Sequence, residues 1–182
     1  RDDQNTKWGI QNYYFIEAHD YTMKLPEKYY GPGSYDNWIA VGWGLRNENY
    51  ELFPIFLKFS SQSNDFSWST DLYKLIDMWN GFTPAIGGKT LRSLMYWSKQ
   101  ENPTAYKKIK DKSIGAYIDE TLKHNLEFDI ANVVYHVYKD NYICSSIKNN
   151  IWYEYKTGRW YEIDQGTTLR QSLSTVIYKL YR

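Results

Sequence analysis

Large apolar side chains recur at helical spacing through the middle of the chain. Between about residues 34 and 110 they fall three and four positions apart, as one buried face of a helix requires. Four segments carry such a face. The faces consist of Trp38, Val41, Gly42 and Leu45; of Leu52, Phe56 and Phe59; of Leu72, Leu75, Ile76 and Trp79; and of Leu91, Leu94, Met95 and Ser98.

Caps and breaks give these helices their ends. Pro54 is tolerated in the first turn of the second helix, Asn80-Gly81 ends the third, and Gly87-Gly88 is the next break. Thr90 then caps the fourth helix. Asn102-Pro103 starts a fifth in the preferred order of cap and proline.

The regions on either side of the fourth and fifth helices are less regular. In the fifth helix Tyr106 and Ile109 point inward, and we expect the connector 113–125 to hold one more short helix. Residues 1–33 show no clear period and end in a Gly-Pro-Gly loop signal, which predicts a linker or an irregular lead-in.

The pattern changes after about residue 125. Residues 130–138 predict another helix, and Tyr142–Ser146 predicts a strand. Over 151–163, aromatic and β-branched residues flank Lys156-Thr157-Gly158, which is typical of a β-hairpin. A last helix is expected after Gly166.

The predicted fold class is therefore mainly α. A lead-in over 1–33 precedes a small helical bundle over 34–124, and an α+β segment with a hairpin follows over 125–182.

Composition adds a local charge imbalance to this picture. The net charge is only +1, but residues 1–88 carry 7 basic and 11 acidic side chains, whereas residues 89–124 carry 8 and 4. A basic middle segment on a neutral chain is consistent with one basic face, although a solvated helix surface gives the same count.

Cysteine usage and the chain ends bear on context. The single Cys144 excludes a disulfide within the chain and fits a reducing, intracellular compartment. No apolar run approaches membrane-spanning length, so no membrane association is expected. The chain opens on Arg1 and stops at Arg182 inside a helical pattern. We interpret it as a piece of a longer polypeptide.

Gly88-Lys89-Thr90 imitates a phosphate-binding loop without being one. Such a loop needs a glycine five positions before the glycine that precedes the lysine, and Thr83 occupies that position. A glycine turn followed by a helix cap explains the motif. A phosphate at that helix N-terminus, aided by Lys89 and Arg92, remains an alternative.

Catalytic and metal-binding patterns are weak. Glu17, His19 and Asp20 are three possible ligands within four positions, but they lie in a region of unclear structure. One cysteine and isolated histidines cannot build a zinc site. We expect no catalytic residue, no metal site and no cofactor in residues 1–182.

Binding features are stronger. Cations for phosphates and aromatic rings for bases are the two ingredients of single-strand recognition. Aromatic core packing and merely solvated lysines are the alternatives. The candidate nucleic-acid-binding residues in the middle segment are Lys89, Arg92, Trp97, Lys99, Lys107, Lys108 and Lys110. Lys156 and Arg159, near Trp152 and Trp160 of the hairpin, are a second candidate set, with cross-strand aromatic packing as the alternative.

These segments resemble a known family. Asp36-Asn-Trp-Ile-Ala-Val-Gly-Trp-Gly-Leu45, Thr90-Leu-Arg-Ser-Leu-Met-Tyr-Trp-Ser98 and Asn102-Pro-Thr-Ala-Tyr106 are similar to the primase C-terminal 2 domain. That helical domain lies between the primase and the superfamily 3 helicase domains of poxvirus-type primase-helicases from large DNA viruses. The hairpin residues 151–160 similarly resemble the start of the region that precedes the helicase core.

The resemblance implies a role without chemistry for this chain. The parent protein would prime and unwind DNA with Mg²⁺ and ATP, using active sites outside residues 1–182. The chain itself would be a non-catalytic connector that contacts single-stranded template DNA, flanked by the primase and helicase domains. The alternative is a docking or oligomerisation collar for a hexameric helicase ring. Replication in the host cytoplasm is the implied location.

Overall fold

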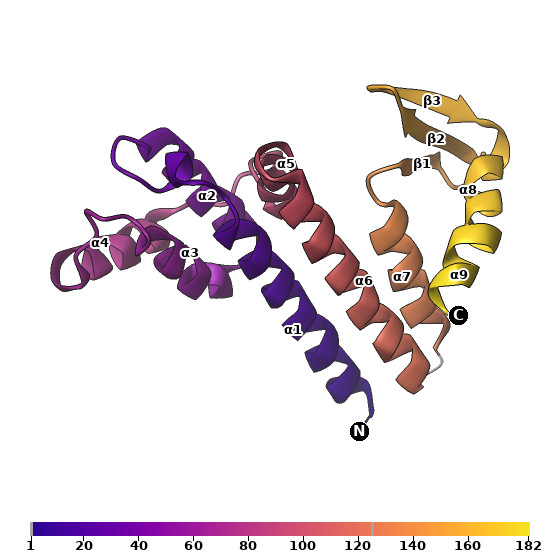
Figure 1. The fold of residues 1–182 in the computed structure, drawn as a ribbon, viewed down its shortest axis with the longest axis horizontal. Helices are drawn as coiled ribbons and strands as arrows, with labels where there is room; N and C mark the ends of the chain where they lie inside the picture. Colours follow the sequence, from indigo (N-terminus) through magenta and orange to yellow (C-terminus); the bar gives the residue numbers. More distant parts are fainter. Residues whose placement is uncertain (1, 125) are drawn as a thin grey trace. The chain divides into compact units, whose positions relative to one another are not determined.

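The computed structural model describes residues 2–124 and 126–182, and they form two compact units. The first unit comprises residues 1–111 and the second residues 112–182 (Figure 1). These units do not coincide with the predicted segments, since their boundary falls inside a helix. Each unit is described by itself below.

Helices are the only regular secondary structure among the described residues of the first unit. Its long helix α1 spans Asp2–Met23, and its shorter helices are α2 (Tyr35–Glu48), α3 (Phe53–Ser60), α4 (Trp68–Gly81) and α5 (Leu91–Glu101). Helix α6 (Pro103–His124) begins in this unit and continues into the second. The predicted helices of residues 34–110 are thus confirmed, with Pro54 in the first turn of α3.

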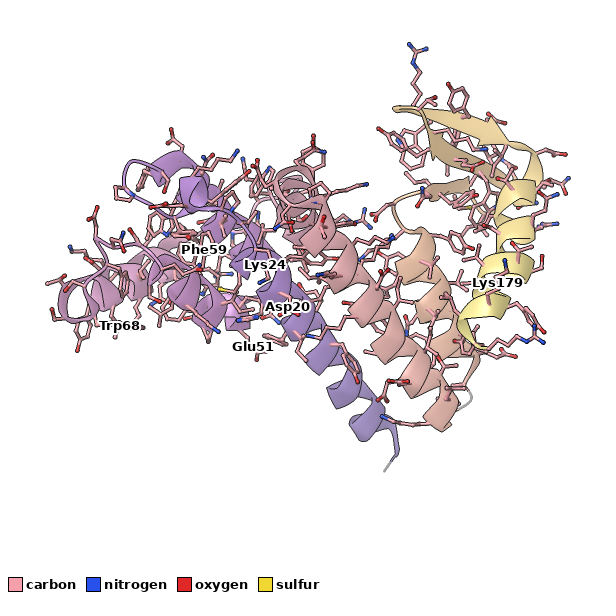
Figure 2. The ribbon with its side chains drawn as sticks, viewed as in Figure 1. Asp20, Lys24, Glu51, Phe59, Trp68 and Lys179 are labelled. Carbon is pink, nitrogen blue, oxygen red and sulfur yellow. The ribbon has the colours of Figure 1, made fainter. Side chains whose placement is uncertain are left out.

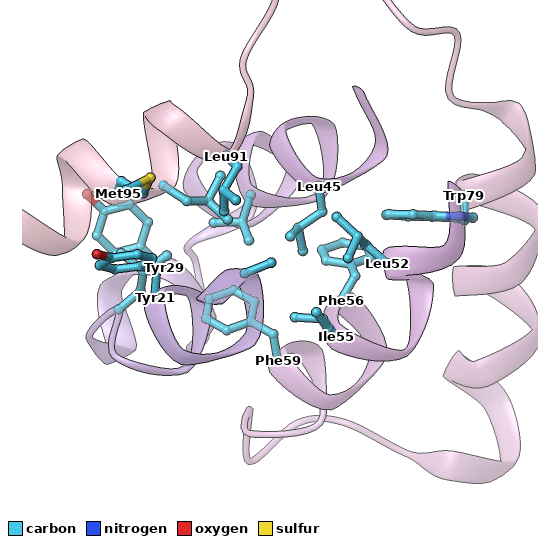
Figure 3. Packing of buried hydrophobic residues seen from close by; sticks show 14 of the residues in the cluster. Tyr21, Tyr29, Leu45, Leu52, Ile55, Phe56, Phe59, Trp79, Leu91 and Met95 are labelled. Carbon is cyan, nitrogen blue, oxygen red and sulfur yellow. The ribbon is translucent and has the colours of Figure 1, made fainter. Parts of the chain in front are cut away.

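Most residues of the predicted apolar faces form the core of this unit, whereas Leu72 and Ile76 lie outside it and Trp38 packs against it half-buried. Leu52, Phe56 and Phe59 are fully buried, and so are Val41 and Leu45 (Figure 3). All four residues of the α5 face, Leu91, Leu94, Met95 and Ser98, are buried as well. Figure 2 labels Phe59, which belongs to this core, and Trp68 at the start of α4, which is 59% exposed.

Helix α1 corrects the expectation of an irregular lead-in. Its buried residues include Glu17, Ala18, Tyr21 and Thr22, which are spaced as one helix face but are small, polar or amphipathic. The Thr22 hydroxyl donates to the Ala18 carbonyl at 2.7 Å, so this buried hydroxyl has a hydrogen-bond partner within its own helix. Because this face is not simply apolar, hydrophobic periodicity did not reveal it.

Helix α6 corrects the expectation of a connector with a separate short helix. The helix runs without a break through Ser113 and Gly115 to His124. Ile114, Tyr117 and Thr121 are buried along its second half. Tertiary packing therefore outweighs the helix-weakening effect of the glycine.

The second unit combines helices with a small sheet. Helix α7 (Glu127–Tyr138) precedes strands β1 (Tyr142–Ser146), β2 (Ile151–Lys156) and β3 (Arg159–Ile163), which pair antiparallel in that order. The chain ends in α8 (Thr167–Ser172), a π-helical turn (Leu173–Ile177) and α9 (Tyr178–Leu180). The mainly α fold class and the three strands are confirmed.

The predicted hairpin turn is confirmed in detail. Lys156 pairs with Arg159, and the two residues between them both have positive φ, 48° at Thr157 and 82° at Gly158. Two positive φ angles are the signature of a type I′ turn, whose twist matches that of the flanking strands.

A buried carboxylate ties the sheet to α8. Glu154 of β2 is 8% exposed, and it accepts hydrogen bonds from Tyr142 of β1 (3.1 Å) and Thr168 of α8 (2.8 Å). Lys156 forms an ion pair with it at 2.9 Å.

In the described part of the chain, none of the helices combines the length and the apolar character that a membrane span requires.

Candidate nucleic-acid interface

The exposed side of α5 carries two cations with an aromatic ring between them. Arg92, Tyr96 and Lys99 follow one another at spacings of four and three, which places them on the face opposite the buried stripe. All three are exposed, and 60% of the Tyr96 side chain is open to solvent. The helix therefore presents charge and a ring together.

Trp97 lies beside this face and not on it. Its ring is half-buried, packs against the core cluster and contacts Tyr29 with ring centroids 5.8 Å apart. The sequence singled out Trp97 as the base-stacking candidate, whereas the structure places Tyr96 in the open position. Tyr96 falls outside the buried apolar stripe of α5, and this position in the helical pattern could have identified it as the exposed ring.

The first turns of α6 extend the supply of cations. Lys107 and Lys108 are exposed, and Lys110 is half-buried, while Tyr106 and Ile109 are buried as predicted. The Lys99 ammonium of α5 lies 5.7 Å from the centre of the Tyr106 ring, which places the last turn of α5 next to the first turn of α6. We call Arg92, Tyr96, Lys99, Lys107, Lys108 and Lys110 the basic face.

Glu101, the acidic residue at the end of α5, does not cancel these charges. Its carboxylate forms an ion pair with Lys28 at 2.7 Å and accepts a hydrogen bond from the Tyr29 hydroxyl. Burial of Tyr29 and the neighbouring carboxylate raise the pKa of that hydroxyl, so it remains a donor.

A tight turn precedes α5 where the sequence imitates a phosphate loop. The Gly88 amide donates to the Ala85 carbonyl at 3.0 Å, and Gly87 has a φ of 75°. Asn47 of α2 clamps both ends of this turn: its Oδ1 accepts from the Ala85 amide (3.1 Å), and its Nδ2 donates to the Lys89 carbonyl (2.8 Å).

This turn is a structural device with an exposed lysine at its end. A Cβ on Gly88 would lie 2.6 Å from the Asn47 amide nitrogen, so glycine is required for the clamp. The Lys89 side chain is exposed beside the N-terminus of α5. The glycines here shape the turn, in agreement with the interpretation of the motif as a glycine turn followed by a helix cap.

A protein carboxylate already occupies the helix N-terminus. Glu48 Oε1 accepts from the Leu91 amide at 2.9 Å, and Oε2 accepts from the Tyr14 hydroxyl at 3.1 Å. Burial and the Glu48 charge raise the pKa of Tyr14 far above its ordinary range, so that hydroxyl stays protonated. The alternative of a phosphate on this N-terminus is therefore disfavoured, although the side chains of Lys89 and Arg92 are exposed.

The two hairpin candidates differ from each other. Lys156 is engaged by Glu154, and the hydrogen bond and charge of that carboxylate raise the pKa of the lysine. Arg159 is exposed at the turn. Trp160 is 43% exposed and contacts Tyr155 on the neighbouring strand at 5.1 Å, which is the cross-strand aromatic packing weighed as the alternative.

The acidic and histidine residues near the N-terminus do not converge as a metal site. His19 contacts Asp20 at 3.1 Å and the Lys58 ammonium at 3.0 Å. Throughout the described part of the chain, no three His, Cys, Asp or Glu side chains gather as metal ligands.

Comparison with known proteins finds a family match within the first unit. The family described as primase C terminal 2 matches residues 18–98, from the last six residues of α1 to Ser98 of α5. The match includes the buried residues Ala18, Tyr21 and Thr22, so the C-terminal end of α1 belongs to the same domain as α2–α5.

Viral proteins are similar over most of the chain. A predicted helicase of Acanthamoeba polyphaga mimivirus, L207/L206, is 31% identical over 147 residues, which are 81% of this chain and 15% of that protein. A predicted primase of African swine fever virus, C962R, is 28% identical over 142 residues, 72% of this chain and 14% of that protein. The chain thus spans about a seventh of these curated relatives.

Proposed function

Because residues 18–98 belong to the primase C terminal 2 family, within a chain similar to segments of large-DNA-virus primase and helicase proteins, we propose a role in viral DNA replication. The chain acts as a non-catalytic connector between a primase and a helicase domain of one polypeptide. Its basic face contacts the single-stranded DNA template as it passes between them.

The observation that carries the DNA contact is the arrangement on α5. Tyr96 is exposed on the same helix face as Arg92 and Lys99, and the first turns of α6, which begins two residues after α5 ends, carry the exposed Lys107 and Lys108. Phosphate attraction and stacking of a base on an exposed ring together give binding that tolerates any sequence. A template strand read for priming needs such tolerance.

The chemistry of priming and unwinding belongs outside this chain in our proposal. Among the described residues no cluster fits a metal ion, and the Gly88-Lys89-Thr90 turn is held by Asn47 instead of forming a phosphate cradle. We therefore assign Mg²⁺ and ATP to the flanking domains of the parent protein, and its site of action to the cytoplasmic replication site of the virus.

Fluorescence anisotropy tests the DNA contact directly. The purified chain is titrated against a labelled single-stranded oligonucleotide at low and at high salt. We expect binding at low salt that weakens strongly as salt rises, because phosphate contacts release counterions. Absence of binding at low salt would refute the proposal.

A docking or oligomerisation collar is the second candidate. It is favoured by apolar exposure in the second unit, where Phe128 and Tyr135 are 62% and 50% exposed and share one face of α7 at a spacing of seven. Multi-angle light scattering across a concentration series separates the two. A multimer inert to DNA supports the collar, and a monomer that binds DNA excludes it.

A further inference from the structure

An apolar cavity of about 350 Å³ lies in the first unit, away from the residues of the basic face. It is formed by the loop before α2, the start of α2, the end of α3, the turn that follows α3, and α4, and it shares no lining residue with the basic face. Its apolar walls are Tyr35, Trp38, Phe66, Leu75 and Met78.

The aromatic walls are held in place by contacts with neighbouring residues, among them Ser60, which also lines the cavity. The Trp38 indole N–H donates to the Ser60 hydroxyl at 2.8 Å, and its ring stacks on Phe56 at 5.2 Å. Phe66 is braced edge to face by Trp68 at 5.1 Å. The cavity is therefore preformed, and a bound group gains apolar contact without ordering the protein first.

Two carboxylates, Asp65 and Asp71, and one ammonium group, Lys74, line the cavity, so the lining has a net charge of −1. Asp71 is already engaged, since its carboxylate accepts from the Ser67 amide (2.9 Å) and pairs with Lys74 (3.1 Å); these contacts lower its pKa. Asp65 also lines the cavity and is exposed, and within the described part of the chain its carboxylate has no hydrogen bond or ion pair.

We propose that this cavity is a docking site for a peptide segment of a partner protein that carries a large aromatic side chain directly beside a lysine or arginine. The aromatic group fills the apolar space as a buried anchor. The adjacent cation pairs with Asp65 at the edge. A nucleotide is a poor occupant, because its phosphates would face the Asp65 carboxylate.

This site is independent of the DNA contact. The basic face lies on α5 and α6, whereas the cavity is lined by the loop before α2, the start of α2, the end of α3, the turn between α3 and α4, and α4. One surface can therefore hold template while the other binds protein.

Nuclear magnetic resonance of the ¹⁵N-labelled chain tests the site through the Trp38 indole N–H. The probes are two blocked tetrapeptides, Ala-Trp-Lys-Ala and the matched Ala-Trp-Glu-Ala. We expect the lysine peptide to shift the Trp38 signal with millimolar affinity, and the glutamate peptide to bind about threefold more weakly, the size of one exposed ion pair.

Two surface variants isolate the charge. In Asp65→Asn the preference for lysine should disappear, whereas Asp77→Asn, on the exposed side of α4 and outside the cavity, should retain it. The proposal is overturned if neither peptide shifts the Trp38 signal, or if both bind equally to the unaltered chain. A Trp38 shift produced by a single-stranded oligonucleotide in place of the peptides would overturn it as well.

Discussion

Two neighbouring aromatic residues of α5 lie in different environments. Trp97 is half-buried against Tyr29, and Tyr96 is open beside Arg92 and Lys99. One position along a helix rotates a side chain by about 100°, which is enough to exchange core for solvent. Composition cannot distinguish the two, but the register of the buried stripe can.

Replacing Tyr96 by alanine should weaken DNA binding without unfolding the chain. We expect a loss of about tenfold in affinity for a single-stranded oligonucleotide, the effect of one lost stacking contact. The free energy of unfolding should change by less than about 0.5 kcal/mol, because the ring is exposed. Anisotropy and urea denaturation measure the two quantities.

Matched variants separate stacking from folding. Tyr73→Ala, at a 71% exposed tyrosine on α4, should leave affinity unchanged. Trp97→Ala should lower stability by about 1–3 kcal/mol through lost packing. Wild-type affinity in Tyr96→Ala would show that the ring contacts no base.

Glu154 should make the stability of the second unit depend on pH. Burial alone would raise the pKa of its carboxyl, but hydrogen bonds from Lys156, Thr168 and Tyr142 outweigh burial and lower the pKa below 4.5. A lowered folded-state pKa stabilises the unit above pH 4.5, and this contribution is lost as the pH falls through the folded-state value.

Chemical denaturation between about pH 3 and pH 7 measures this dependence. Glu154→Gln should be less stable at neutral pH and should lose much of the acid-dependent decrease. Glu162→Gln, on the neighbouring exposed strand, should keep it. An unchanged pH profile in Glu154→Gln would show that the three donors do not stabilise the charged form.

At the scale of elements, sequence pattern predicts helices whose buried face is apolar and misses one whose face is not. The faces of α2–α5 consist mainly of large apolar residues, and their positions were predicted. Helix α1 buries Glu17, Ala18 and Thr22 instead. Their burial depends on the partners that tertiary structure brings, which no local period encodes.

The candidate site was predicted in part for the same reason. Lys107 and Lys108 lie on the exposed side of α6 as expected from its buried residues Tyr106 and Ile109, whereas Lys110, also expected there, is half-buried. The contacts of Asn47 with the turn before α5, and of Glu48 with the N-terminus of α5, were not predictable. Each of these hydrogen bonds joins residues about forty positions apart.

Gly88→Ala should disturb the turn before α5. The added methyl group would meet the Asn47 amide nitrogen at 2.6 Å and the Ala85 carbonyl oxygen at 3.0 Å. We expect a destabilisation of about 1–2 kcal/mol in thermal or urea unfolding. Gly81→Ala, where nothing lies within 4 Å, should stay within about 0.5 kcal/mol of the unaltered chain. Equal stabilities would mean that the clamp is easily displaced.

At the scale of the whole chain, the small net charge conceals segments of opposite charge. Residues 1–88 carry an acidic excess and residues 89–124 a basic excess. The proposed protein-docking cavity belongs to the acidic part, and the basic face to the other. In our proposal the chain therefore holds a nucleic acid and a protein on separate surfaces of one small domain.

The salt dependence of DNA binding tests the central claim most directly. Affinity for a single-stranded oligonucleotide is measured against salt concentration for the unaltered chain, for Lys99, Lys107 and Lys108 changed together to glutamine, and for a control with Lys24, Lys148 and Lys179 so changed. All six lysines are exposed. The slope of log affinity against log salt should shrink by about 2 in the first variant, or about 0.7 per lost phosphate contact. It should stay unchanged in the control. Equal slopes in the two variants would contradict a DNA-contacting face on α5 and α6.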